Sequence, residues 1–289
     1  MGAGTATELS EAPTRLSFPS AWQAVGLLAL LLLLQLLLGV VLLVARPVLP
    51  VPPDHPGAQG VVALLAGIAV AWYGWRRRGG SLAATFSLRP VSPLLLVAVI
   101  LTVAGLGIVL SEVDNALRSV LPPPQWLAEF FEQFSYGRRG MWGAVFAVVI
   151  AAPIAEELVF RGVILQGFLA RYRVGTAVAA SALLFGVAHG NPWQLVGATA
   201  FGIVAAWWFL GTRSLMPCIL GHALGNGLPS LLQAAGLDVR GYTSGMSEVV
   251  QFQPLWFDAI GVVLLGAGLW LTRSVFAAGF SVAADPQPS

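Results

Sequence analysis

Residues 141–170 read MWGAVFAVVIAAPIAEELVFRGVILQGFLA, and their apolar run is long enough to cross a bilayer, which takes about 17–25 helical residues. Three charges, Glu156, Glu157 and Arg161, interrupt this run. Each would cost about 2.5–3.5 kcal/mol at mid-membrane unless it is paired or faces a polar cavity. Glu157 and Arg161 share a helix face and can pair, whereas Glu156 is turned about 100° away and has no partner in its own helix. Pro153 lacks an N–H and opens the backbone ladder just before them. The stretch therefore predicts a membrane helix that contributes to a polar site.

The composition of the whole chain agrees with a membrane protein. Of its 289 residues, 57% are hydrophobic and 10% are charged, whereas a typical soluble domain is about 25% charged. The mean hydropathy is +0.81. These values exclude a soluble globular enzyme, a disordered chain and a nucleic-acid-binding protein, which would need a dense basic face. The single cysteine, Cys218, excludes an internal disulfide and a metal site built from cysteines.

Apolar runs of membrane-spanning length recur along the chain and predict an all-α, polytopic membrane protein with about eight transmembrane helices around an intramembrane active-site cavity. Residues 114–140 are too polar to span, and the amphipathic segment WLAEFFEQF within them is expected at the membrane interface. The expected spans are 21–45, 58–75, 93–112, 141–165, 174–190, 194–211, 214–235 and 253–272.

The arginines predict the orientation of these spans, because cytoplasmic loops carry an excess of Lys and Arg. With eight spans and a cytoplasmic N-terminus, nine arginines fall in inner loops and five in outer loops, so both termini are expected to be cytoplasmic. The inner set is Arg15, Arg76, Arg77, Arg78, Arg89, Arg171, Arg173, Arg213 and Arg273, and the outer set is Arg46, Arg118, Arg138, Arg139 and Arg240.

Three further polar side chains lie where a membrane helix is ordinarily apolar. His189 ends the fifth span, and His222 and Asn226 lie four residues apart on one face of the seventh. Singly, each could be a packing contact between helices. Glu157 and His189 each lie about 16 residues from the turn near residue 173, so they reach the same depth, about 24 Å from that turn. His222 and Asn226 lie about 13–19 Å from the next such turn. We therefore expect these groups to meet in one buried pocket, which is by default a functional site.

This set of side chains suits hydrolysis of a peptide bond. A glutamate beside a histidine can hold and deprotonate a water, and a second histidine with Asn226 can donate hydrogen bonds to the developing oxyanion. The same residues could instead bind zinc, with Glu157, His189 and His222 as ligands and Glu156 as the base. The H-E-x-x-H zinc motif is absent, and the metal-free mechanism needs fewer assumptions. We therefore expect no cofactor and keep zinc as the alternative.

Three short motifs, in this order on separate spans, resemble those of the CAAX-processing and bacteriocin-processing (CPBP, or Abi) family of intramembrane proteases, which includes the type II CAAX prenyl endopeptidase. The resemblance covers about residues 145–235. The motifs are E-E-x-x-x-R at Glu156, Glu157 and Arg161, F-x-x-x-H at Phe185 and His189, and H-x-x-x-N at His222 and Asn226.

The resemblance implies an all-helical membrane fold and a protease activity, with the polar motif residues in the active site. Glu156 and His189 would activate the water. His222 and Asn226 would stabilise the oxyanion, and the remaining Glu and Arg of the first motif would support the first pair. The resemblance also implies a site that opens toward the cytosol.

We expect three regions: 1–140 with about three membrane helices and no recognisable motif, 141–235 with the protease-like core, and 236–289 with the last membrane helix and a polar tail. The expected partners are the lipid bilayer and a membrane-associated peptide or protein substrate, without nucleic acid. The expected location is the bacterial inner membrane. Two alternatives to a protease remain: a non-catalytic bacteriocin-immunity or peptide-binding protein, and a proton-coupled transporter in which buried Glu and His relay protons.

Overall fold

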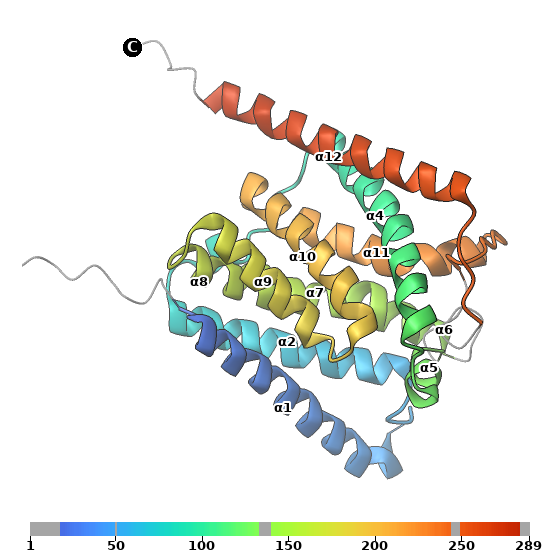
Figure 1. Cartoon of the computed structure of the whole chain (residues 1–289). Coiled ribbons are helices and arrows are strands. Elements are labelled where there is room, and N and C mark those ends of the chain that lie inside the picture. Colours follow the sequence, from blue (N-terminus) through green and yellow to red (C-terminus); the bar gives the residue numbers. More distant parts are fainter. Residues whose placement is uncertain (1–17, 50, 133–139, 244–248, 284–289) are drawn as a thin grey trace, which may run out of the picture.

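The structure is a computed structural model that describes residues 18–49, 51–132, 140–243 and 249–283. Every regular element in these ranges is helical, so the predicted all-α class is confirmed (Figure 1). A 3₁₀ turn, η2, follows the first helix, and η3 and η4 are π-helical. The elements are α1 (Ala21–Ala45), η2 (Arg46–Val48), α2 (Pro56–Arg78), α3 (Leu82–Thr85), α4 (Pro93–Val120), α5 (Gln125–Glu132), α6 (Met141–Val145), η3 (Phe146–Ala151), α7 (Ala152–Val159), η4 (Phe160–Ile164), α8 (Leu165–Leu169), α9 (Val174–Ala188), α10 (Pro192–Thr212), α11 (Met216–Ala234) and α12 (Leu255–Ala283).

Six helical segments of the described chain, rather than the eight expected, are long and apolar enough to cross a membrane. The expected span 174–190 is α9, whose 15 residues extend about 22 Å and fall short of a hydrocarbon core about 30 Å thick. The expected span 214–235 is α11, which His222, Asn226 and Pro229 interrupt. Both shortfalls arise where candidate site residues end or interrupt an apolar helix. The six segments are Ala21–Val48, Pro56–Arg78, Pro93–Val120, Met141–Leu169, Pro192–Thr212 and Leu255–Gly279.

Successive long helices run in alternate directions between two ends of the bundle (Figure 1). α1 begins and α12 ends at the left end of the view. The turn between α8 and α9 and the turn between α10 and α11 lie at this same end. α5 and the turn between α9 and α10 lie at the opposite end. Every long helix therefore connects the same two faces of the molecule.

The short helix α5 bears out the amphipathic pattern of its sequence. Leu127 and Ala128 are buried, whereas the side chains of Trp126 and Phe130 are exposed. One face of α5 thus packs on the bundle while the other presents large apolar rings, as an interfacial helix would. The last two residues of the predicted segment, 133 and 134, lie outside the described residues.

Close packing of α2 on α7 fixes the height of the charged stretch within the bundle. A methyl group added to Gly67 on α2 would lie 2.5 Å from the Cβ of Ala155 on α7, so only glycine permits the two backbones to approach this closely. Ala155 directly precedes Glu156. The contact therefore fixes the position, relative to α2, of the turn of α7 that carries both glutamates.

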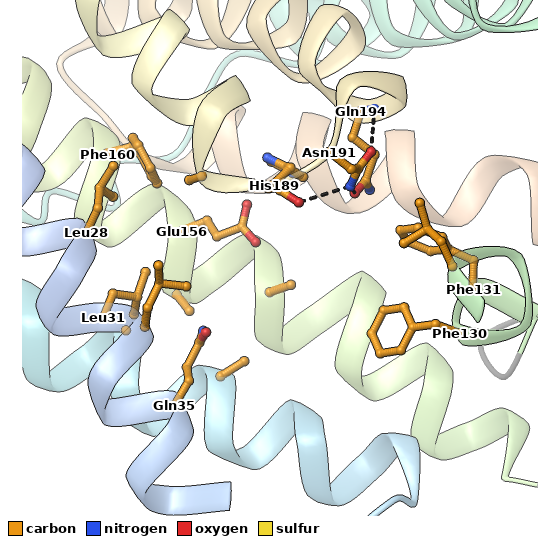
Figure 2. A pocket seen from close by; sticks show the side chains of 18 of the residues that line it. Leu28, Leu31, Gln35, Phe130, Phe131, Glu156, Phe160, His189, Asn191 and Gln194 are labelled. Atoms are coloured by element: carbon orange, nitrogen blue, oxygen red, sulfur yellow. Dashed lines mark hydrogen bonds between the residues drawn. The ribbon is translucent and has the colours of Figure 1, made fainter. Parts of the chain in front are cut away.

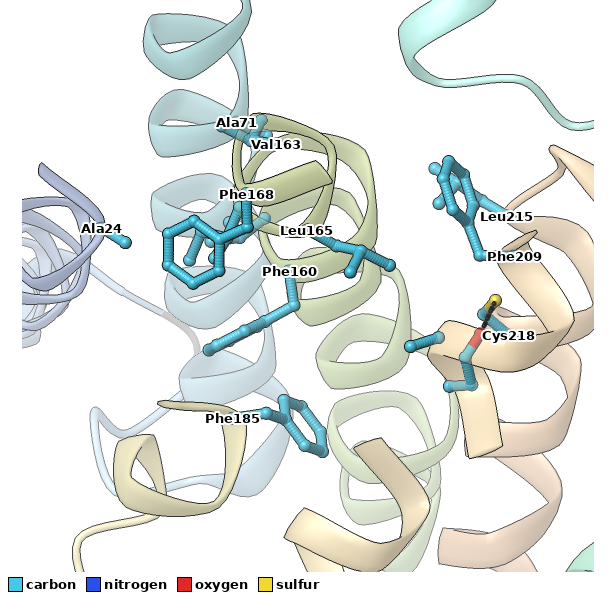
Figure 3. Packing of buried hydrophobic residues seen from close by; sticks show 14 of the residues in the cluster. Ala24, Ala71, Phe160, Val163, Leu165, Phe168, Phe185, Phe209, Leu215 and Cys218 are labelled. Carbon is cyan, nitrogen blue, oxygen red and sulfur yellow. Dashed lines mark hydrogen bonds between the residues drawn. The ribbon is translucent and has the colours of Figure 1, made fainter. Parts of the chain in front are cut away.

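A buried apolar cluster occupies the part of the bundle beyond those glutamates (Figure 3). Phe160, Phe168, Phe185 and Phe209 are each at most 3% exposed. The rings of Phe160 and Phe185 meet edge to face, with centroids 4.9 Å apart, a geometry that aromatic pairs favour. This cluster forms the apolar core beside the polar side chains of the candidate site.

Candidate active site

Glu157 lies at the centre of a buried polar network. Its Oε1 accepts hydrogen bonds from Arg161 Nη1 and from His222 Nδ1, each at 2.9 Å. Glu157 is 0% exposed and Arg161 is 1% exposed, so the ion pair predicted from their i,i+4 spacing is confirmed. The bond to His222 joins two helices that are far apart in the sequence. The network therefore fixes α11 against α7.

Arg161 is held by groups beyond Glu157. Its Nη2 donates to the backbone oxygen of Gly202 at 3.2 Å. Its guanidinium carbon lies 4.6 Å from the ring centroid of Phe185 and 5.9 Å from that of Phe201, which places the cation over aromatic faces. Burial removes the guanidinium from water at a cost in free energy, and these contacts offset part of that desolvation cost.

The contact with Glu157 also sets the proton arrangement of His222. An ionised carboxylate can only accept hydrogen bonds, so Nδ1 of His222 must carry a proton. Its other nitrogen, Nε2, lies 3.9 Å from Oε2 of Glu156. This Glu156 oxygen is buried and makes no hydrogen bond within the protein. Glu156 is therefore the unsatisfied carboxylate that the sequence predicted, and it faces the second nitrogen of His222.

His189 is the C-cap residue of α9. Its Nδ1 lies 2.8 Å from the backbone oxygen of Phe185, and a carbonyl only accepts, so Nδ1 carries the proton and Nε2 is free to accept one. Gly190 has a positive φ of 69°, which glycine adopts without strain. Asn191 then caps α10 by accepting from Gln194 N at 2.9 Å, and its amide donates to His189 O at 2.9 Å. This turn holds the histidine in place.

Pro153 and the π-helical turn before it position Asn226. In η3 the N–H of Ala152 bonds to Ala147 O, so in this register the donor for Val148 O would be the N–H of residue 153. Proline has no N–H, and Val148 O instead accepts from Nδ2 of Asn226 at 2.9 Å. The second hydrogen on Nδ2 stays available to another acceptor. π-Helical turns often occur at functional sites.

If this site hydrolyses peptides, as the sequence predicts, the geometry predicts that Pro153→Ala lowers kcat by about tenfold, the effect of about one hydrogen bond of 1.4 kcal/mol. The new backbone N–H at position 153 would compete for Val148 O and release Asn226. KM should change little, and Asn226→Ala should add little to the effect. Steady-state kinetics on a cleaved peptide provide the measurement.

Pro93→Ala is the matched control, because Pro93 stands in the first turn of α4, where an N–H has no helical partner. Wild-type kcat in Pro153→Ala would contradict this role.

Glu156, His189, His222 and Asn226 line one cavity of about 680 Å³. Helices α1, α2 and α5 complete its wall, with Gln35, Gln59, Phe130 and Phe131 among the lining residues. An adjoining cavity of about 530 Å³ shares Glu156 and His189, and Figure 2 shows it from close by, with Glu156 and His189 on one side and Phe130 and Phe131 on another. Glu157 and Arg161 are buried behind this wall. Four of the polar motif residues, which come from α7, α11 and the end of α9, thus line one cavity, and Glu157 does not.

Sequence reasoning missed several residues that line the cavity or pack on its polar side chains. Phe201 packs on His222 with ring centroids 5.0 Å apart, but its position in an apolar span gives no sign of this contact. Gln35 is a single polar residue within a run of leucines, and this signal could have pointed to a cavity. The aromatic pair of α5 was assigned to the membrane interface and also lines the cavity wall.

The described residues do not place the side chains that the zinc alternative would need around one metal ion. Among the described residues, no group of three His, Cys, Asp or Glu side chains is placed to hold a metal ion. Glu157 accepts from Arg161 and from His222, and the arginine cation beside it opposes a second cation. The set Glu157, His189 and His222 therefore does not fit a zinc site in this arrangement.

Comparison with known proteins supports the reading of the motifs. Residues 138–228 match the family model described as Type II CAAX prenyl endopeptidase Rce1-like. The match includes every motif residue from Glu156 to Asn226 and leaves the N-terminal helices outside. No curated protein matches the chain, and no solved structure does. The chain is thus an integral membrane protein, and its residues 138–228 are similar to the type II CAAX prenyl endopeptidase Rce1-like family.

Proposed function

We propose that this protein is an intramembrane endopeptidase that hydrolyses a peptide bond of a membrane-associated peptide or protein with water activated by Glu156 and His189. The observation that carries the proposal is the convergence of Glu156, His189, His222 and Asn226 on one cavity of about 680 Å³. Such a cavity lies within the range of ligand sites, about 300–1,000 Å³.

Glu156 and His189 have the hydrogen-bonding state that water activation needs. Oε2 of Glu156 has no protein partner, and Nε2 of His189 can accept a proton because Nδ1 is committed to a backbone oxygen. A water between them would lose a proton as its oxygen attacks the carbonyl carbon of the substrate. The same proton would then pass to the leaving amine as the C–N bond breaks.

His222 and Asn226 supply donors for the oxyanion of the tetrahedral intermediate. Asn226 keeps one N–H beyond its bond to Val148 O. His222, with Nδ1 bonded to Glu157, would donate through Nε2 when it is protonated. Donors that are fixed before the reaction stabilise the developing charge without reorganisation. Glu157 and Arg161 act as positioning residues, since they hold His222 and face no cavity of the site.

A cleavage assay with purified protein and a library of quenched peptides tests this function. We expect wild-type protein to cleave, and the rate to stay unchanged after treatment with a metal chelator. Loss of cleavage with chelator and its recovery with zinc would establish the zinc-dependent alternative instead. Peptide binding without cleavage by any library member would favour the non-catalytic alternative, in which the motif residues form a binding site only.

A further inference from the structure

The two ends of the helical bundle differ sharply in charge. We define the arginine end as the end where α1 begins and the carboxylate end as the end where α2 begins. Within the described residues, no Asp or Glu lies at the arginine end. The arginine end carries Arg76, Arg77, Arg78, Arg89, Arg171, Arg173, Arg213 and Arg273, whereas the carboxylate end carries Asp54, Glu112, Asp114, Glu129, Glu132, Asp238 and Asp258 together with Arg46, Arg118 and Arg240.

The cavity of the candidate site opens at the carboxylate end. Its outer lining comes from the last turns of α1, the first turns of α2 and α10, and α5, all of which lie at that end (Figure 1). Leu42, Pro53, Gln59, Phe130 and Gln194 are among these lining residues.

The apolar cluster closes the other direction. Along α7 to α8, Phe160 and Phe168 follow Glu156 toward the arginine end, and along α11, Leu215 and Cys218 lie between that end and His222. Phe168, Leu215 and Cys218 are 0% exposed and Phe160 is 1% exposed (Figure 3). A packed interior of this kind leaves no passage for a peptide. Access from the arginine end would require the core to open.

From this arrangement we propose that the candidate site faces the non-cytoplasmic side of the membrane, and that its substrate is a peptide segment presented there. An excess of Arg in short loops marks the cytoplasmic side, and the cavity opens on the face opposite to that excess. The proposal names the substrate class of the proposed protease and so rests on that function. Two sequence expectations, cytoplasmic termini and a site open to the cytosol, cannot both hold in this fold. The charge distribution favours the first.

Cysteine labelling in sealed vesicles tests the sidedness without any need for activity. The single native cysteine, Cys218, is 0% exposed, so an introduced cysteine at the surface is the reporter. Asp54→Cys reports the carboxylate end, and Ser81→Cys reports the arginine end. Both positions are exposed, and Ser81 makes no side-chain cap bond. Wild-type protein is the unlabelled control.

In right-side-out vesicles, a membrane-impermeant maleimide is expected to label Asp54→Cys, and to label Ser81→Cys only after detergent is added. Inverted vesicles should give the reverse. Labelling of Ser81→Cys in intact right-side-out vesicles would overturn the proposal.

A second measurement adds an impermeant peptide, chosen from those that the purified protein cleaves, to the same vesicles. We expect cleavage by right-side-out vesicles and cleavage by inverted vesicles only after detergent. Cleavage confined to intact inverted vesicles would overturn the proposal even if labelling agreed with it. If labelling agrees but purified protein cleaves no peptide, the protease function fails while the orientation of the cavity stands.

Discussion

Glu156→Gln is expected to abolish cleavage while leaving the protein folded, with a fall in kcat of about 10²–10⁴-fold, the usual contribution of a general base. Glutamine keeps the size of the side chain but cannot take a proton from water. Oε2 of Glu156 makes no hydrogen bond within the protein, so the substitution removes little native structure. Cleavage kinetics with the best library peptide provide the measurement.

A matched control separates the loss of this base from a general loss of negative charge. Glu129 on α5 is exposed and accepts from Gln125 Nε2 at 2.8 Å, and glutamine can also accept at this position. Glu129→Gln should therefore cleave as wild type does. A fully active Glu156→Gln protein would remove Glu156 from the mechanism. Retained protection of cells against a toxic peptide by an inactive Glu156→Gln protein would point to the non-catalytic immunity alternative.

Arg161→Met is expected to lower the free energy of unfolding by about 3–5 kcal/mol, as is typical when one partner of a buried ion pair is removed. This is the largest loss of stability among the variants proposed for this protein. Glu157 would remain buried with His222 as its one hydrogen-bond partner. Cys218 offers a native reporter, because it is the single cysteine and is 0% exposed. A thiol-reactive dye added during heating in detergent reports unfolding when this thiol becomes accessible.

Two further variants test the physical reason for that loss. Arg46→Met removes an exposed arginine and should change the free energy of unfolding by less than about 0.5 kcal/mol. Arg161→Met combined with Glu157→Met removes both charges and should recover part of the stability, since an apolar pair can replace a buried ion pair. Unfolding of Arg161→Met at the wild-type midpoint would contradict the stabilising role of the pair.

The sequence predicted the parts of the site that depend on local spacing. The i,i+4 interval forecast the pair of Glu157 and Arg161, and the 100° offset forecast the unpartnered state of Glu156. Glu156 and His189 lie about the same number of residues from a shared turn, and this predicted that they lie at the same depth in the membrane. These inferences succeed because helical rise and rotation per residue are nearly constant.

The parts that depend on packing between distant helices could not be read from the sequence. The hydrogen bond from His222 to Glu157 joins residues 65 positions apart, and the place of Phe201 beside His222 depends on the rotation of α10. The π register of η3 gives no compositional signal, although Pro153 marked where the ladder opens. Six of the eight expected spans are long and apolar enough to cross a membrane. The other two, α9 and α11, carry site residues and are shorter or less apolar than a regular span.

Single-turnover cleavage in water that carries a heavy oxygen isotope tests the central claim most directly. If Glu156 and His189 activate water, the new carboxylate of the N-terminal fragment gains one heavy oxygen, and the protein gains none. Mass spectrometry of the peptide product and of the fragment containing Glu156 gives both results. The label on Glu156, which would mean direct attack by the carboxylate, or the absence of any cleavage by wild-type protein, would contradict the account.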